Sequence, residues 1–143
     1  MKNNVPKSLW SRLQKNDDII VLDGRKYSKE MVIGEERKGL KISMITDTRP
    51  IEDIGRFIDG SDYFICEGTY GDDEDLSKAI KNKHMTFREA ATLAKEGRVK
   101  KLLLTHFSTA MNEPEIYCKN AKEVFDNTLI GFDRYSECLN FND

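Results

Sequence analysis

The chain has 143 residues, 34% of them charged, and a formal net charge of only −2. This length is typical of one domain with a buried core, so we predict a single domain over residues 1–143. The near balance of charges argues against disorder and against a strongly basic nucleic-acid surface, although a local basic patch remains compatible with RNA binding.

Neither a membrane span nor a secretion signal is evident. No apolar run approaches the roughly 20 residues that cross a bilayer, and the first residues lack the apolar segment of a signal peptide. The three cysteines, Cys66, Cys118 and Cys138, are far apart and form no Cys-x-x-Cys pair. We therefore expect a soluble cytoplasmic protein with reduced thiols.

The first third of the chain predicts one helix and three strands. Apolar residues at helical spacing after Pro6 indicate a short helix over residues 8–14. An apolar run at 19–22 ends in Asp23-Gly24, a strong hairpin signal, so a return strand is expected around 26–33. A charged loop at 34–39 leads to residues 40–45, whose alternating pattern indicates a half-buried strand.

From residue 46 onward, helices and strands alternate. Helices are predicted at 51–58, at 76–80, from the capping box Thr86–Glu89 to Gly97, and from Pro114 onward, with Ile116, Val124 and Phe125 on the inner side of the last. Strands are predicted at 62–66, 99–104, 128–130 and 138–141. This alternation favours an α/β fold whose central strands are parallel.

Polar residues follow three of these strands. Asp47, Glu67 and His106 each come directly after a strand, and His84 lies just before the capped helix. Functional groups gather beyond the carboxyl ends of parallel strands, so we expect these four residues at one edge of the sheet. Carboxylates and imidazoles are ligands of zinc-like ions, which suits a metal-assisted hydrolytic site.

Each residue also has a purely structural interpretation. Asp47 could cap the following helix, and Glu67 could be a solvated turn residue. His106 could bond to backbone at a strand end, and His84 could merely precede the Thr86 cap. The chain has only two histidines in all, too few to complete a usual zinc site.

Four strings together are more specific than any one of them. In order, they are Asp47-Thr48-Arg49-Pro50, Ile65-Cys66-Glu67-Gly68-Thr69-Tyr70-Gly71-Asp72, His84-Met85-Thr86-Phe87-Arg88-Glu89-Ala90-Ala91 and Leu104-Thr105-His106-Phe107-Ser108. Their order and spacing resemble ribonuclease Z, also called tRNase Z, whose members are metallo-β-lactamase-fold endonucleases that trim the 3′ ends of precursor tRNA. The opening Val5-Pro6-Lys7-Ser8-Leu9-Trp10 and the loop at 34–39 resemble the family's middle region.

The resemblance covers only the carboxyl-terminal half of that family. It implies half of an αββα sandwich, a mixed sheet with helices on one face and an opposite face that lacks its second sheet. The family's amino-terminal half carries a His-x-His-x-Asp-His motif, a further metal-binding histidine and the arm that grips tRNA, none of which is in this sequence. The resemblance therefore implies that the chain alone is inactive, and we expect it to bury the open face by forming a homodimer.

The resemblance also implies a role for each candidate residue. Asp47 would bridge two zinc ions and His106 would ligate one of them. His84 would not be a ligand but would donate or steer a proton and contact the scissile phosphate, with Glu67 supporting the site. Two metals can activate a bridging water, and an imidazole can act as an acid at neutral pH.

Three functional hypotheses remain open at this stage. The chain is half of a zinc-dependent endoribonuclease acting on precursor tRNA, or an inactive truncated fragment that serves as a structural or self-associating module. A third hypothesis is another phosphodiesterase of the metallo-β-lactamase fold, but the string around His84 argues against it because that string is more particular to ribonuclease Z.

Overall fold

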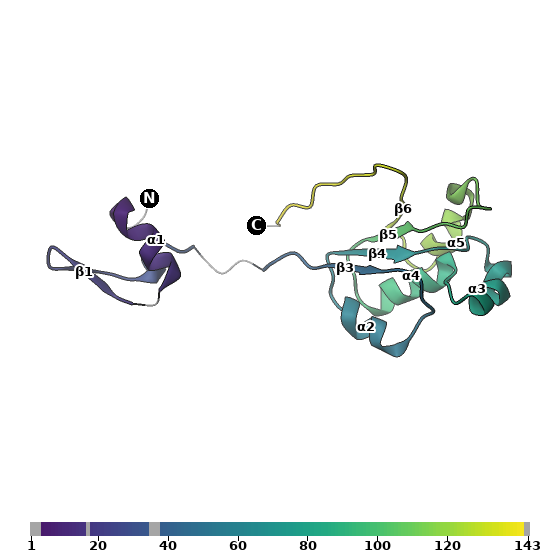
Figure 1. Cartoon of the computed structure of the whole chain (residues 1–143), viewed down its shortest axis with the longest axis horizontal. Helices are drawn as coiled ribbons and strands as arrows, with labels where there is room; N and C mark the ends of the chain where they lie inside the picture. Colours follow the sequence, from purple (N-terminus) through teal and green to yellow (C-terminus); the bar gives the residue numbers. More distant parts are fainter. Residues whose placement is uncertain (1–3, 17, 35–37, 142–143) are drawn as a thin grey trace. The chain divides into compact units, whose positions relative to one another are not determined.

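The computed structural model describes residues 4–16, 18–34 and 38–141. It divides into two compact units, Met1–Lys38 and Gly39–Asp143 (Figure 1). The single domain expected over residues 1–143 stays a prediction. The charged loop expected at 34–39 lies in part outside the described residues.

The first unit is a helix and a hairpin. Helix α1 (Lys7–Lys15) buries Leu13 completely, and it is followed by β1 (Ile20–Leu22) and β2 (Arg25–Tyr27), which pair antiparallel. Asp23 and Gly24 both have positive φ, 49° and 76°, as the predicted two-residue turn requires. The return strand is shorter than predicted, because a 3-10 turn at Lys29–Met31 replaces its second half.

The second unit contains a four-stranded sheet. Its strands are β3 (Ile42–Ile45), β4 (Tyr63–Glu67), β5 (Leu102–Thr105) and β6 (Thr128–Ile130). They lie in the order β3-β4-β5-β6, and every neighbouring pair is parallel. The predicted α/β class is therefore confirmed, but this sheet is parallel throughout and not mixed, and among the described residues the antiparallel pairing is that of β1 with β2.

The helices of this unit connect the strands. They are α2 (Glu52–Ile58), η2 (Asp73–Asp75), α3 (Leu76–Asn82), α4 (Phe87–Glu96), η3 (Pro114–Tyr117) and α5 (Cys118–Lys122). The capping box predicted at the start of α4 is present, since Glu89 N donates to the Thr86 side chain and Thr86 N to that of Glu89. None of the helices in the described part of the chain is long and apolar enough to span a membrane.

One face of the sheet packs under helices and the other does not. Phe64, Cys66 and Leu104 are fully buried in a core that α2 and α4 complete from the same side of the sheet (Figure 1). Side chains alternate along a strand, so the other face carries Ile42 and Met44, which are 58% and 60% exposed. The predicted arrangement of helices on one face is thus observed.

Two predictions at the end of the chain are wrong. Residues 138–141 form no strand within the described structure, because an apolar tetrapeptide becomes a strand only where a neighbouring strand accepts its hydrogen bonds. Ile116, expected on the inner side of its helix, is 59% exposed, since the helix starts with the 3-10 turn η3. Val124 and Phe125 do pack against the core.

Candidate metal site

The four candidate residues meet at the carboxyl edge of the sheet. Asp47 follows β3, Glu67 ends β4 and His106 follows β5. Asp47 and His106 adopt left-handed φ values of 53° and 57°, so the chain turns sharply as it leaves each strand. Such values are uncommon in residues other than glycine and concentrate at functional sites.

Asp47 and His106 face each other across this edge. His106 Nε2 lies 3.3 Å from Asp47 Oδ1, and the two side chains are 42% and 63% exposed. One ligand atom from each of Asp47, His84 and His106 lies within 4.8 Å of the other two. A carboxylate and two imidazoles at this spacing suit a zinc-like ion.

Thr69 orients the His106 ring. The Thr69 hydroxyl has a single proton and two acceptors, Glu67 Oε2 at 2.8 Å and the His106 carbonyl oxygen at 3.2 Å, and the closer, charged carboxylate is the better acceptor. The hydroxyl oxygen, 3.2 Å from His106 Nδ1, then accepts a hydrogen bond from the N–H of that ring nitrogen. The lone pair of a neutral His106 is therefore on Nε2, facing a carboxylate oxygen, and two acceptors at this distance favour a proton or a cation between them. The residues present therefore fit a metal.

Glu67 lies behind this edge and is fully buried. Its carboxylate accepts from Thr48 N at 2.6 Å and Met85 N at 3.0 Å, and from the Thr69 hydroxyl. It also lies 3.0 Å from His84 Nδ1. A buried carboxylate needs such partners to offset its desolvation, and these come from three separate loops.

The Glu67 contact sets the chemistry of His84. With Nδ1 donating to the carboxylate, a neutral His84 ring presents an unprotonated Nε2 and a charged ring presents a proton there. The side chain is 23% exposed, and its ring centroid is 5.5 Å from that of His106. His84 can thus exchange a proton at the same open edge that Asp47 and His106 occupy.

Arg49 joins the loops that carry Asp47 and His84. Its guanidinium forms a bidentate ion pair with Glu89, and Nη1 also donates to the His84 carbonyl oxygen at 2.6 Å. Glu89 in turn accepts from Thr86 N at 3.0 Å in the capping box of α4. Arg49 therefore fixes the His84 loop against the loop that follows β3.

Sequence reasoning placed the four candidates at one edge but missed Arg49 and Thr69. Both stood in the quoted strings, two residues from Asp47 and from Glu67 respectively. The signal available was an arginine two residues after a strand-end aspartate and just before a proline, and this pattern does not identify a partner 40 positions away. The neighbouring Cys66 has no such role, because burial raises the pKa of its thiol well above the usual range.

Comparison with known proteins gives a consistent result. The chain is 72% identical over 142 residues to ribonuclease Z of Clostridium beijerinckii and 61% identical over 142 residues to ribonuclease Z of Clostridioides difficile. Each match covers 99% of this chain and 46% of the relative, so the chain spans about half the length of the curated relatives it matches. No protein-family model matches it.

Solved structures agree on the fold. The short form of human tRNase Z is 30% identical with a TM-score of 0.53, over 66% of this chain and 32% of that one. The metallo-β-lactamase fold protein YhfI of Bacillus subtilis is 28% identical with a TM-score of 0.54, over 61% of this chain and 35% of that one. The predicted resemblance to ribonuclease Z is confirmed, and the chain has the architecture of part of a metallo-β-lactamase fold.

Proposed function

We propose that this chain, which resembles ribonuclease Z over nearly its whole length, is the carboxyl-terminal half of a zinc-dependent endoribonuclease that matures the 3′ end of precursor tRNA. The observation that carries the proposal is the pairing of Asp47 Oδ1 with His106 Nε2 at 3.3 Å, on an open edge beside the Glu67–His84 pair. The 72% identity to a ribonuclease Z supports the same activity and substrate.

Asp47 and His106 are the residues that would hold zinc. Zinc would supply Lewis-acid stabilisation of the phosphate and a bound water of lowered pKa. A catalytic zinc usually has three protein ligands, and two from this chain are too few for tight binding. We therefore expect well under one tightly held zinc per isolated chain, and the remaining ligands to come from the missing half.

His84 and Glu67 would handle the proton. Glu67 holds His84 Nδ1, so the proton to be transferred is on Nε2 at the open edge. His84 would give it to the oxygen of the leaving ribose as the phosphodiester is cut, which leaves a 3′ hydroxyl on the tRNA. In this assignment His84 is a proton donor and not a metal ligand, although it lies close enough to Asp47 and His106 to be one.

The exposed apolar residues of β3 support a second candidate, a self-associating module. Ile42 and Met44 are exposed on the sheet face opposite the helices. In the complete enzyme the amino-terminal half would cover this face, and in the isolated chain we expect homodimerisation in the cytoplasm to cover it. Analytical ultracentrifugation at micromolar concentration tests this, because a stable compact monomer would argue against the dimer.

A chimera tests the enzymatic proposal. This chain would replace the matching 142 residues of the Clostridium beijerinckii ribonuclease Z, to which it is 72% identical. We expect the chimera to bind zinc and to cut precursor tRNA after the acceptor stem, while the isolated chain does neither efficiently. A folded chimera that holds zinc without cutting would refute the proposal and favour the inactive module.

A further inference from the structure

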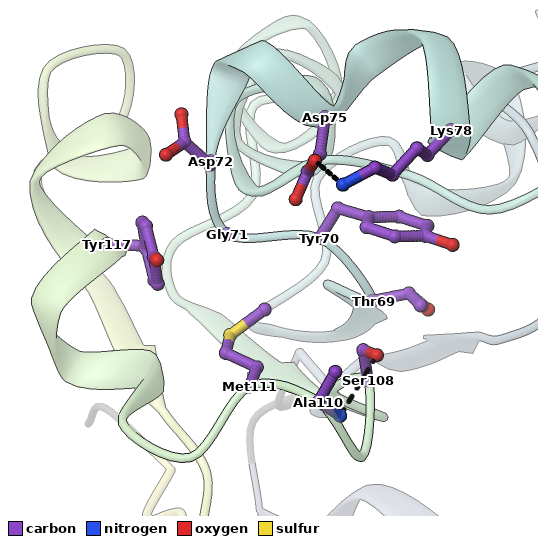
Figure 2. Close-up of a pocket in the computed structure, with 10 residues that line it drawn as sticks. All are labelled: Thr69, Tyr70, Gly71, Asp72, Asp75, Lys78, Ser108, Ala110, Met111 and Tyr117. Atoms are coloured by element: carbon purple, nitrogen blue, oxygen red, sulfur yellow. Dashed lines mark hydrogen bonds and ion pairs between the residues drawn. The ribbon is translucent and has the colours of Figure 1, made fainter.

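A pocket is lined in part by the loops that follow β4 and β5, and Figure 2 shows the residues around it. It holds about 220 Å³ and shares two residues with the loops of the metal edge. Thr69 is the hydroxyl that orients His106, and Ser108 is two residues beyond His106 and donates its backbone N–H to Thr69 O at 3.0 Å. We call this hollow the Tyr70 pocket.

The walls of the Tyr70 pocket combine flat apolar groups with hydroxyls. Figure 2 shows the rings of Tyr70 and Tyr117 and the thioether of Met111 around the hollow, with Thr69 and Ser108 at one side. Aromatic rings and hydroxyl groups are the surfaces on which proteins stack and hydrogen-bond single-stranded bases.

The pocket is built on fixed backbone. Tyr70 N donates to Met85 O at 3.2 Å and Phe87 N donates to Tyr70 O at 2.9 Å, so one wall is anchored to the segment that follows His84. Asn82 Nδ2 donates to Tyr70 Oη at 2.6 Å and holds the ring. At Gly71 a Cβ would lie 2.6 Å from the Tyr117 side chain, so only glycine lets that ring approach so closely.

Its charges disfavour a phosphate as the occupant. Asp72 and Asp75 both line the pocket, and the one cation among its lining residues, Lys78, is paired with Asp75 at 2.5 Å. A phosphate would face two carboxylates without an unpaired cation, whereas an uncharged base meets no such repulsion and its amino groups can donate to carboxylates.

We propose that the Tyr70 pocket binds one nucleobase of the RNA strand, that of a nucleotide adjacent to the bond that is cut. The inference rests on the proposed function, since it takes the Asp47–His106 edge as the position of the scissile phosphate. Thr69 touches both that edge and the pocket, so a base on a neighbouring nucleotide is within reach. The pocket would fix the register of the strand, which phosphate contacts alone do not specify.

The test uses the 143-residue chain itself and does not depend on cleavage. The chain has five methionines, so methyl-labelled methionine gives a short NMR spectrum in which Met111 reports on the pocket. The probe is a single-stranded tetraribonucleotide, and its control is the same sugar–phosphate chain without bases. We expect the tetraribonucleotide to shift the Met111 methyl signal and the abasic chain to leave it unchanged, while the exposed Met44 on the open sheet face does not respond.

A pair of matched variants sharpens the test. Ala110→Trp fills the pocket mouth at an exposed lining position, and Glu115→Trp adds the same ring at an exposed position outside the lining. With the pocket filled, the base can no longer stack on its aromatic rings. The affinity for the tetraribonucleotide, measured by titrating the Met111 shift, should therefore fall at least about tenfold in Ala110→Trp and stay unchanged in Glu115→Trp. The fully buried Met85 methyl verifies that each variant is folded, and Tyr70→Leu is the replacement should Ala110→Trp disturb it.

The remaining outcomes separate this inference from the proposed function. A Met111 shift with the abasic chain, a shift that survives Ala110→Trp, or no shift at all would each overturn the nucleobase site. A chimera that still cleaves precursor tRNA under those results would leave the proposed function standing. If the shift depends on the bases but the chimera does not cleave, the Tyr70 pocket still binds a base and the proposed enzymatic function is refuted.

Discussion

The two sides of the carboxyl edge differ in how complete they are. Around Glu67, a fully buried carboxylate has four partners from this chain alone, and His84 is held in one orientation. Around Asp47 and His106, two partly exposed side chains face each other at 3.3 Å, and under the proposed function they would need a zinc ion and further ligands. Under the proposed function, the chain builds by itself the side that would handle the proton and only part of the side that would hold the metal.

We expect the largest effect from a change at Asp47, on zinc retention and cleavage. In the chimera, Asp47→Ala should abolish both zinc retention and precursor tRNA cleavage, because Asp47 is the one carboxylate among the residues that would hold zinc in the proposed site. In the isolated chain the same change should alter the free energy of unfolding by no more than about 1 kcal/mol, since the side chain is largely exposed. Elemental analysis and a cleavage assay measure the first effect, and urea unfolding the second. Full zinc content in Asp47→Ala would contradict the assignment.

His84→Ala separates the two sides by their chemistry. We expect cleavage by the chimera to fall about 10²–10⁴-fold, the usual contribution of a general acid, with zinc content nearly unchanged. The matched control is Lys83→Ala, because Lys83 is next to His84 in the chain and its side chain is exposed. If His84→Ala lost zinc together with activity, His84 would be a ligand and our division of roles would be wrong.

The side around Glu67 should contribute more to the free energy of unfolding than the side around Asp47. Glu67→Leu keeps the volume but leaves the backbone N–H groups of Thr48 and Met85 without their acceptor. Each such donor without a partner costs about 1–3 kcal/mol, so for the two of them we expect a loss of about 2–6 kcal/mol in the isolated chain. Urea denaturation with an unchanged m value measures it. A stability equal to that of Asp47→Ala would remove the contrast between the two sides.

How far the sequence predicts this edge depends on the range of each interaction. Strand and helix alternation, the Thr86–Glu89 capping box and the hairpin turn at Asp23-Gly24 are local patterns, and the structure confirms them. The convergence of Asp47, Glu67 and His106 follows from one further rule, that parallel strands end at a common edge.

The remainder depends on tertiary contacts that leave no local periodicity. Arg49 reaches Glu89 across 40 positions, and a charge in one loop does not specify which distant carboxylate it meets. The strand predicted at 138–141 was wrong for a related reason. The composition of this segment is typical of a strand, but no neighbouring strand pairs with it in the described structure.

Arg49 gives the smallest and most specific prediction. If it acts by fixing the His84 loop, Arg49→Met in the chimera should lower kcat about tenfold with little change in KM or zinc content, and Arg49→Lys should recover only part of the loss, because a single ammonium cannot reproduce the bidentate pair with Glu89.

The decisive measurement for Arg49 is a double-mutant cycle with His84→Ala. Residues that act through one another are not additive, so Arg49→Met should cost much less in the His84→Ala background than in the parent chimera. Unfolding measurements on the same proteins separate a general loss of stability, which would slow both backgrounds equally. If Arg49→Met still lowered kcat tenfold in the His84→Ala background, Arg49 would act elsewhere, on the Asp47 loop or on the RNA. The contacts by which Arg49 joins the two loops would then have no effect on catalysis.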